Sequence, residues 1–127
     1  MQYTSTREDK ELLNFKQVTL KGLASDGGLY VPENWENLNL KFVNTNITFE
    51  KTAYEIIKYF VGNSLDSQLL KKLISRSYKS FRNIEITTIK KLDKKNYILE
   101  LYHGPTLAFK DIALQFFGNA FEEFLKK

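Results

Sequence analysis

The sequence predicts an α/β protein, with an α+β arrangement when this chain is taken by itself. Two patterns predict this class. Four segments carry apolar residues at helical spacing, and three short stretches between turn signals are rich in β-branched, aromatic and other apolar residues. The chain has 127 residues, 43% hydrophobic and 27% charged, a composition typical of a globular protein. This length leaves room for one ordinary hydrophobic core.

The N-terminal part of the chain predicts one helix, one turn and one short strand. Residues 15–24 place apolar side chains on one side of a helix, and Asn14 can cap its start. Residues 25–28 read Ser-Asp-Gly-Gly, which indicates a turn because glycine permits positive φ angles. Residues 29–31 then predict a strand that Pro32 stops.

Two further helices follow an irregular segment. Residues 33–47 contain five asparagines and predict irregular surface structure. Apolar residues recur at helical spacing in residues 49–61 and again in residues 65–79. The residues that can end or cap these helices are Thr48 and Gly62 for the first, and Ser64 or Asp66 for the second.

A hairpin and a long helix complete the chain. Residues 84–92 and 97–102 are rich in Ile, Thr, Tyr and Leu, and the Asp-Lys-Lys-Asn sequence between them indicates a hairpin. An unbroken apolar stripe then predicts a helix that runs to about Leu125. Five of the ten phenylalanines fall in the last 19 residues, so exposing this helix to water would be unfavourable. We expect it to pack on the N-terminal domain, or to mediate dimerisation or a domain swap.

Composition and charge exclude several classes of partner. The net charge is +4, but the basic residues are scattered among 15 acidic ones, so nucleic-acid binding is not expected. No apolar run approaches the ~20 residues of a membrane helix, and the polar N-terminus is not a secretory signal. The chain has no cysteine, which removes disulfides and thiolate metal sites. We expect a cytoplasmic protein with no metal site and no nucleic-acid or membrane partner.

The candidate site lies between the last predicted strand and the last predicted helix, in residues 103–111. The Gly-Pro-Thr sequence at residues 104–106 predicts a sharp turn at the C-terminal end of a strand, where α/β proteins place ligands. Lys110 is expected in the first turn of the helix, partly buried beside Phe109. The positive end of the helix dipole disfavours a cation there. A neutral lysine amine is the form that makes a Schiff base with an aldehyde.

Each of these residues also has a simpler interpretation. Lys110 on placement alone could be an ordinary lysine at a frayed helix start. His103 is the only histidine, and a turn or hydrogen-bonding role is more common for such a residue than catalysis. Asp111 suits a helix N-terminus and could hold the ammonium form of the neighbouring lysine in place. No metal cluster, Ser/His/Asp arrangement or P-loop is present in the sequence.

Three strings of the sequence resemble the threonine synthase family. Residues 103–111, HGPTLAFKD, continued by IALQFFGN, resemble the family's pyridoxal-phosphate lysine motif. Residues 3–7, YTSTR, resemble its start, and residues 22–32, GLASDGGLYVP, resemble the segment that follows. The strings occur in the family's order and span nearly the whole chain. The resemblance is to the longer class of threonine synthases, which carry an extra N-terminal domain.

The resemblance implies a fold-type II pyridoxal-phosphate enzyme. Members convert O-phospho-L-homoserine and water into L-threonine and phosphate. Residues 1–95 would form the N-terminal domain, with helices and a short sheet, and residues 96–127 would form the first strand and helix of the catalytic domain. The lysine aligned with Lys110 would carry the cofactor as a Schiff base and then shuttle protons between substrate carbons. The cofactor would serve as the electron sink.

The resemblance assigns the remaining candidate residues less firmly. Phe109 would pack near the cofactor ring. The string Ser5, Thr6 and Arg7 could bind the substrate phosphate, because an arginine fork matches phosphate oxygens. A buried arginine paired with a carboxylate is the alternative. Residues with open roles are His103, Thr106, Asp111, Gln115 and Asn119, of which the last two could reach toward the site or form hydrogen bonds within the domain.

The sequence also departs from the family. Glu8 stands where a glycine commonly follows the Ser-Thr-Arg string. Family members are much longer, and the glycine-rich loop that cradles the cofactor phosphate lies beyond the lysine, so the six glycines here form no such loop. We therefore expect a fragment that is inactive alone and ends just past the cofactor helix. The alternatives are a threonine-synthase-like phospholyase acting on a related phospho-amino compound, or a stand-alone, non-catalytic binding module.

Overall fold

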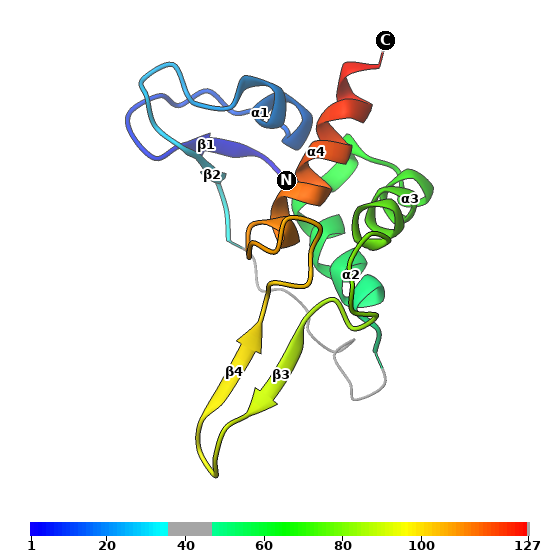
Figure 1. Ribbon diagram of the computed structural model, residues 1–127. Coiled ribbons are helices and arrows are strands. Elements are labelled where there is room, and N and C mark those ends of the chain that lie inside the picture. Colours follow the sequence, from blue (N-terminus) through cyan, green and yellow to red (C-terminus); the bar gives the residue numbers. More distant parts are fainter. Residues whose placement is uncertain (36–46, 127) are drawn as a thin grey trace.

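The computed structural model describes residues 1–35 and 47–126 and has the expected α+β composition (Figure 1). The irregular surface predicted for residues 33–47 therefore lies almost wholly outside the described residues. The elements, in chain order, are β1 Tyr3–Ser5, α1 Phe15–Lys21, β2 Tyr30–Pro32, α2 Phe49–Val61, the 3-10 turn η2 Gly62–Ser64, α3 Ser67–Tyr78, β3 Thr88–Lys91, β4 Tyr97–Glu100 and α4 Asp111–Leu125.

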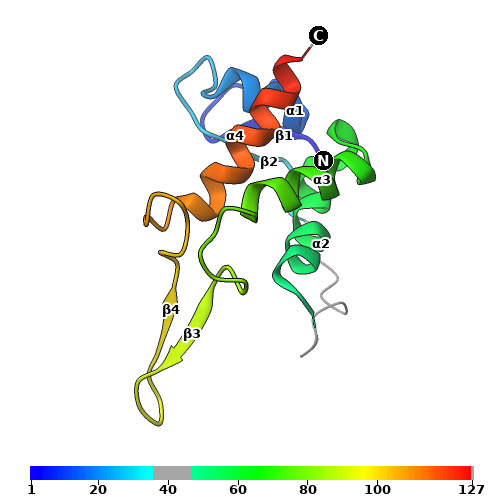
Figure 2. The same cartoon turned by 45° about the vertical axis from the view of Figure 1, so that its right-hand side comes forward.

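The core lies where α2, α3 and α4 meet, and α1 packs against the part of α4 nearer its C-terminal end (Figures 1 and 2). Its members on α3 and α4 are apolar side chains that recur at helical spacing, as predicted, whereas Val61, Leu65 and Ile86 lie outside the predicted helical stripes. The full set is Val61, Leu65, Leu70, Leu73, Ile74, Tyr78, Ile86, Phe116, Ala120 and Phe124. No helix in the described part of the chain is long and apolar enough to cross a membrane.

Polar side chains cap the helices largely where the sequence predicts. Asn14 and Gln17 form a reciprocal capping box at the start of α1, in which each side chain accepts from the other residue's amide. Asp66, rather than Ser64, caps α3 by accepting from two amides. The first helix ends at Lys21 instead of residue 24, because Gly22 at φ +77° takes the chain out of the helix.

The N-terminal sheet contains a strand that the sequence analysis missed. Tyr3–Ser5 forms β1 and pairs antiparallel with β2, with Tyr3 opposite Pro32. Pro32 is thus the last residue of its strand rather than the residue that stops it. Three residues are too short for an alternating pattern to be recognised, and the strand exists because of a partner that lies far along the chain.

The predicted hairpin is present but shorter than expected. β3 and β4 pair antiparallel from Thr88 opposite Glu100 to Lys91 opposite Tyr97, and they project away from the helices (Figure 2). β3 begins after the predicted residue 84 because Ile86 adopts φ +62° and buries its side chain in the helical core. This conformation is rare for a β-branched residue, and it turns the chain before the strand begins.

The apolar stripe of α4 divides into two faces. Phe116, Ala120 and Phe124 are buried against the other helices, which confirms that the helix packs on the preceding part of the chain. Other apolar residues stay exposed, among them Leu114 at 54% and Phe117 at 47%. The predicted boundary between residues 95 and 96 falls in the loop of the β3–β4 hairpin and stays a prediction.

Candidate functional site

Lys110 lies directly before α4 and its main chain belongs to the start of that helix. Its carbonyl oxygen accepts hydrogen bonds from the amides of Ala113 and Leu114, at 3.1 and 2.8 Å. The side chain is exposed, and no hydrogen-bonding or charged group of the described residues contacts Nζ. The expected partial burial beside Phe109 is absent from this chain, since Phe109 is itself 65% exposed. The main chain of Lys110 is therefore held at a helix N-terminus, while its side chain is exposed.

The turn before Lys110 is organised by Asp111. The Asp111 carboxylate accepts from both the amide and the hydroxyl of Thr106, at 2.8 and 2.9 Å, and from the Gln115 side chain at 3.2 Å. The residue is only 2% exposed. Burial would raise the pKa of this carboxyl, but the hydrogen bonds from Thr106 and Gln115 outweigh burial and lower it. The carboxylate thus contacts Thr106 and Gln115 and does not hold the Lys110 ammonium in place.

Glycine is required at position 104 for this arrangement. A Cβ atom there would lie 2.4 Å from both Cβ and Oδ2 of Asp111, which is closer than atoms can approach. The turn also places Leu107 at φ +62°, a conformation that costs free energy for any residue except glycine. The short Gly-Pro-Thr sequence therefore makes the sharp turn that was predicted, with Asp111 packed against its inner side.

His103 joins a polar cluster at the base of the hairpin. Its Nε2 lies 3.1 Å from the Thr88 hydroxyl and 3.4 Å from Oε2 of Glu100. Thr88 donates to the same carboxylate at 2.7 Å, and this bond, with one from Tyr102, lowers the pKa of Glu100. The His103 carbonyl accepts from the Arg82 amide at 2.8 Å. In this chain His103 therefore has a hydrogen-bonding role, which is one of the two roles that the sequence analysis weighed for it.

Gln115 and Asn119 form hydrogen bonds within the domain, as one of the two interpretations held. Asn119 donates to the Ser77 hydroxyl of α3 at 3.0 Å and to the Gln115 carbonyl at 2.8 Å. Ser77 is 1% exposed and was not singled out from the sequence. A signal for it was present in the sequence, because Ser77 is the small polar residue on the buried side of α3, which is otherwise formed by Leu70, Leu73, Ile74 and Tyr78.

A second polar cluster surrounds Asp26, which the sequence analysis treated only as part of a turn. The Asp26 carboxylate accepts from the Ser5 hydroxyl and from the amides of Glu8, Asp9 and Gly28, at 2.8 to 3.0 Å. These bonds, led by that from the Asp9 amide, lower the pKa of Asp26 to about 2. Asp26 therefore fixes the path of the chain after β1.

The predicted phosphate-binding string takes its shape from this cluster. Arg7 donates from Nη1 to the main-chain oxygen of Asp26 at 2.7 Å, and its side chain is exposed. Thr6 accepts from the Leu29 amide at 3.0 Å. Arg7 is thus neither buried nor bonded to the Asp26 carboxylate, so the alternative of a buried arginine–carboxylate pair does not describe it. Ser5 is committed to Asp26.

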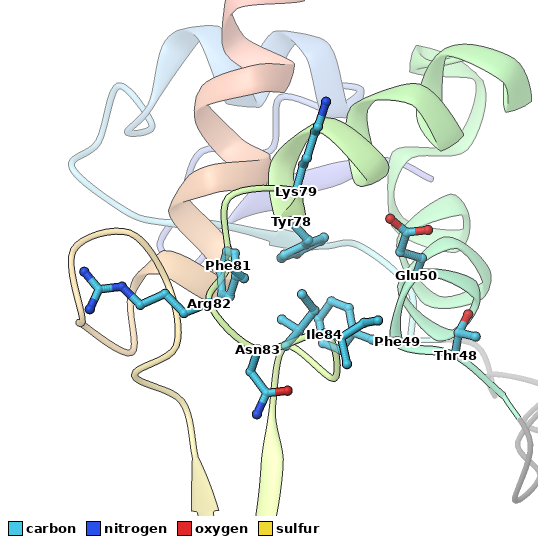
Figure 3. A pocket seen from close by; sticks show the side chains of 10 residues that line it. Thr48, Phe49, Glu50, Tyr78, Lys79, Phe81, Arg82, Asn83 and Ile84 are labelled. Atoms are coloured by element: carbon cyan, nitrogen blue, oxygen red, sulfur yellow. The ribbon is translucent and has the colours of Figure 1, made fainter.

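A pocket of about 580 Å³ lies elsewhere, between the start of α2, the end of α3 and the segment that precedes β3 (Figure 3). Figure 3 shows the side chains of Phe49, Tyr78 and Ile84 gathered around it, while Lys79 points away from it. None of the residues predicted for the site lines this pocket. It offers apolar surface and no cluster of reactive groups, so we place the candidate chemistry at the Lys110 turn.

The fold first defines a class: an α+β chain with the fold of the N-terminal part of solved fold-type II pyridoxal-phosphate enzymes. The chain belongs to the threonine synthase family, because a family model described as "Threonine synthase N terminus" matches residues 2–78. This covers more than half of the chain.

Individual relatives agree with this assignment. Threonine synthase of Schizosaccharomyces pombe is 42% identical over 98% of this chain and 25% of that protein. The crystal structure of PLP-bound threonine synthase from Brucella melitensis superposes with a TM-score of 0.92 at 31% identity, over 98% of this chain and 27% of that one. The yeast threonine synthase structure gives 0.88 at 40% identity, over 98% and 26%. This chain thus spans about a quarter of the length of these relatives.

Proposed function

We propose that this chain supplies the N-terminal quarter of a pyridoxal-phosphate-dependent threonine synthase. That enzyme converts O-phospho-L-homoserine and water into L-threonine and phosphate. The observation that carries the proposal is the geometry at Lys110. Among the residues that the structure describes, no group bonds to its amine, and Lys110 lies at the N-terminus of α4 on a turn that partly buried hydrogen bonds hold closed. Membership of the threonine synthase family supports the same assignment.

The residues of this chain fit one part of the cofactor. The exposed Nζ of Lys110 can bond to an aldehyde carbon. The neighbouring Phe109 offers an exposed ring face for packing against a planar heterocycle. These residues supply no anchor for the cofactor phosphate, because the six glycines of the sequence form no phosphate-binding loop. The remaining contacts would come from the rest of the polypeptide.

The chemistry divides between cofactor and protein. When bound, the cofactor supplies an electron sink for charge that develops on substrate carbons. Lys110 supplies the mobile base, because its amine can take a proton from one substrate carbon and return it to another.

Arg7 is our candidate for holding the phosphate of the substrate. Its guanidinium is exposed, and the bond to the Asp26 carbonyl uses only Nη1. The other nitrogen donors remain available for phosphate oxygens, which an arginine fork matches in geometry. Thr6, next to it and exposed, could add a hydroxyl donor. Ser5 is excluded from this role because Asp26 and the Arg7 amide occupy its hydroxyl.

The direct test is covalent trapping in the full-length protein that carries this chain. Incubation with pyridoxal phosphate and reduction with borohydride should label Lys110, as read by peptide mass spectrometry. Lys110→Ala should lose the label and at least ~10³-fold of the rate of threonine formation, because it removes both the attachment point and the base. Lys72→Ala, which removes an exposed lysine of α3, should change neither.

Two outcomes would contradict the proposal. A label on any other lysine would show that the cofactor assignment is wrong. A correct label at Lys110 without threonine formation from O-phospho-L-homoserine, but with phosphate release from a related phospho-amino compound, would make the protein a threonine-synthase-like phospholyase.

A further inference from the structure

A continuous chain of hydrogen bonds joins the lysine turn to α3. Thr106 donates twice to the Asp111 carboxylate, which also accepts from the Gln115 side chain one turn further along α4. The Asn119 side chain then bridges the two helices, because it donates to the Gln115 main-chain oxygen at 2.8 Å and to the Ser77 hydroxyl at 3.0 Å, while that hydroxyl donates to the Leu73 carbonyl of α3 at 2.7 Å. All of these bonds are at least partly buried, so water competes with them weakly. The turn is thereby tied to the helical core.

We propose that Asp111 is a positioning residue for Lys110. Its carboxylate closes the preceding turn through Thr106, and Ser77 and Asn119 hold the helix that carries it. The proposal rests on the proposed function, because a position matters for chemistry only if Lys110 carries the cofactor.

The burial of the carboxylate explains why the turn must close. Asp111 is 2% exposed, and no cation of the described residues pairs with it. A buried carboxylate is costly unless hydrogen-bond donors surround it. Thr106 lies five residues before Asp111, at the other end of the turn. Its amide and its hydroxyl can both reach Oδ2 only when the two ends of the turn come together. The charge of Asp111 therefore stabilises the closed turn over open ones.

The closed turn requires backbone conformations that its residues do not favour locally, and for this reason it needs stabilisation by Asp111. Leu107 is left-handed at φ +62° although its exposed side chain gains little from packing. Gly104 approaches Asp111 so closely that no other residue fits. A turn with these features would open without the two bonds from Thr106. The hydrogen bonds to Asp111 thus supply the stabilisation of the closed turn that its local backbone preferences do not.

The consequence falls on Lys110 because it lies between Thr106 and Asp111, the two residues that the bonds of the closed turn join. In addition, the helix amides of Ala113 and Leu114 bond to the Lys110 carbonyl. The main chain of Lys110 is therefore fixed, while its Nζ has no partner among the described residues. An amine on a fixed main chain can be aimed at a substrate carbon, and small displacements of such groups reduce rates strongly.

The test uses four variants of the full-length enzyme. Thr106→Val removes the hydroxyl donor with little change of shape, and Thr106→Ser keeps the donor. Asp111→Asn removes the charge but not the oxygen. Glu122→Gln is the matched control, since it removes one carboxylate charge from the exposed side of the same helix, where it pairs with Arg76.

We expect Thr106→Val and Asp111→Asn to lower kcat by about 10- to 100-fold with KM changed by less than about threefold. Thr106→Ser should restore most of kcat, and Glu122→Gln should match the wild type. Borohydride should still label Lys110 in Thr106→Val, with a shifted absorbance of the bound cofactor. A purely structural role would instead lower the amount of folded enzyme and leave kcat per labelled site unchanged.

A double variant makes the test independent of any one substitution. Gly104→Ala displaces Asp111 sterically, so its effect on kcat should not add to that of Thr106→Val if both act through one turn. Additive losses would overturn the proposal, as would wild-type kcat in both Thr106→Val and Asp111→Asn. With either of these outcomes, borohydride labelling of Lys110 in the wild-type enzyme would still support the proposed function. Absence of that label in the wild type would overturn both.

Discussion

Asp26 shows how one carboxylate can determine the shape of a loop. It accepts hydrogen bonds from the Ser5 hydroxyl and from three main-chain amides, so its negative charge replaces the contacts that a longer β1 would have provided. The neighbouring Gly28 is required, because a Cβ atom there would lie 2.1 Å from the Ser5 hydroxyl. The exposed guanidinium of Arg7 depends on this cluster for its direction.

The lowered pKa of Asp26 predicts an acid-dependent loss of stability. Because the folded-state pKa of about 2 is below the unfolded value, Asp26 stabilises the fold fully above pH ~4, and this contribution is lost as pH falls toward 2. Asp26→Asn should lower the melting temperature at pH 7 and flatten its dependence on pH between about 4 and 2. Thermal unfolding followed by circular dichroism across this range checks it, with Glu8→Gln as the control. Equal pH profiles for Asp26→Asn and the wild type would contradict it.

Single residues were predictable from the sequence when their role followed from neighbours in the chain. Lys110 at a helix start follows from the Gly-Pro-Thr turn and the apolar stripe after it. Asp26 and Ser77 were missed because their partners are distant: Ser5 lies on another strand and Asn119 on another helix. Nothing in a local pattern says which distant donor will meet which acceptor.

At the scale of the element, α4 is the most informative part of the fold. Phe116 is 8% exposed in the helical core, whereas its neighbour Phe117 is 47% exposed on the other face. The two residues have the same chemistry and adjacent positions in one helix. They therefore form a matched pair in which only burial differs.

This pair gives a quantitative prediction. Phe116→Ala should lower the free energy of unfolding by about 3–5 kcal/mol, since it removes transfer free energy and leaves a cavity. Phe117→Ala should cost no more than about 1 kcal/mol, because its side chain is half exposed. Urea unfolding of this chain measures both. Equal losses for the two variants would mean that the two faces of α4 are not buried as described.

The periodic elements were predicted better than the short ones. The helices α2, α3 and α4 follow from apolar spacing over three or four turns, which few other structures satisfy. β1 could not be found because three residues carry no period, and the start of β3 was placed too early because Ile86 turns inward at a left-handed φ. These departures have one cause: packing against the helices overrides local preference.

At the scale of the whole molecule, the outer face of α4 is an exposed apolar surface. Leu114, Phe117 and Leu125 are 54%, 47% and 59% exposed on a helix whose other face is core. We propose that the 127-residue chain alone associates through this face, because burying it removes apolar surface from water. The same face would be covered differently in a polypeptide as long as the relatives.

Sedimentation velocity over a range of concentrations tests the association. The apparent mass should rise from monomer toward dimer, and Phe117→Glu should keep the chain monomeric. Ile84→Glu is the control, because Ile84 is 97% exposed but far from α4 in the sequence. A dilute wild-type monomer that also fails to bind a hydrophobic dye would contradict the proposal.

The family could be inferred from the sequence because three strings at separate places agree in order. The arrangement of the site could not, since the resemblance names Lys110 but says nothing of the bonds from Thr106 to Asp111 or from Asn119 to Ser77. Those bonds depend on how α3 and α4 pack, which is a property of the folded chain.

The base of the β3–β4 hairpin has a practical consequence. The chain enters the hairpin beside Arg82 and leaves it at His103, and the bond between the Arg82 amide and the His103 carbonyl closes that entrance. Ile86 and the bonds of His103 to Thr88 and Glu100 tie the near part of the hairpin to the rest of the fold, whereas the bonds of its tip at residues 93–96 are local. The tip projects away from the helices (Figure 2), and loop length adds little entropy cost. A fluorophore or affinity tag between Lys94 and Lys95 would therefore report on the protein without moving Lys110.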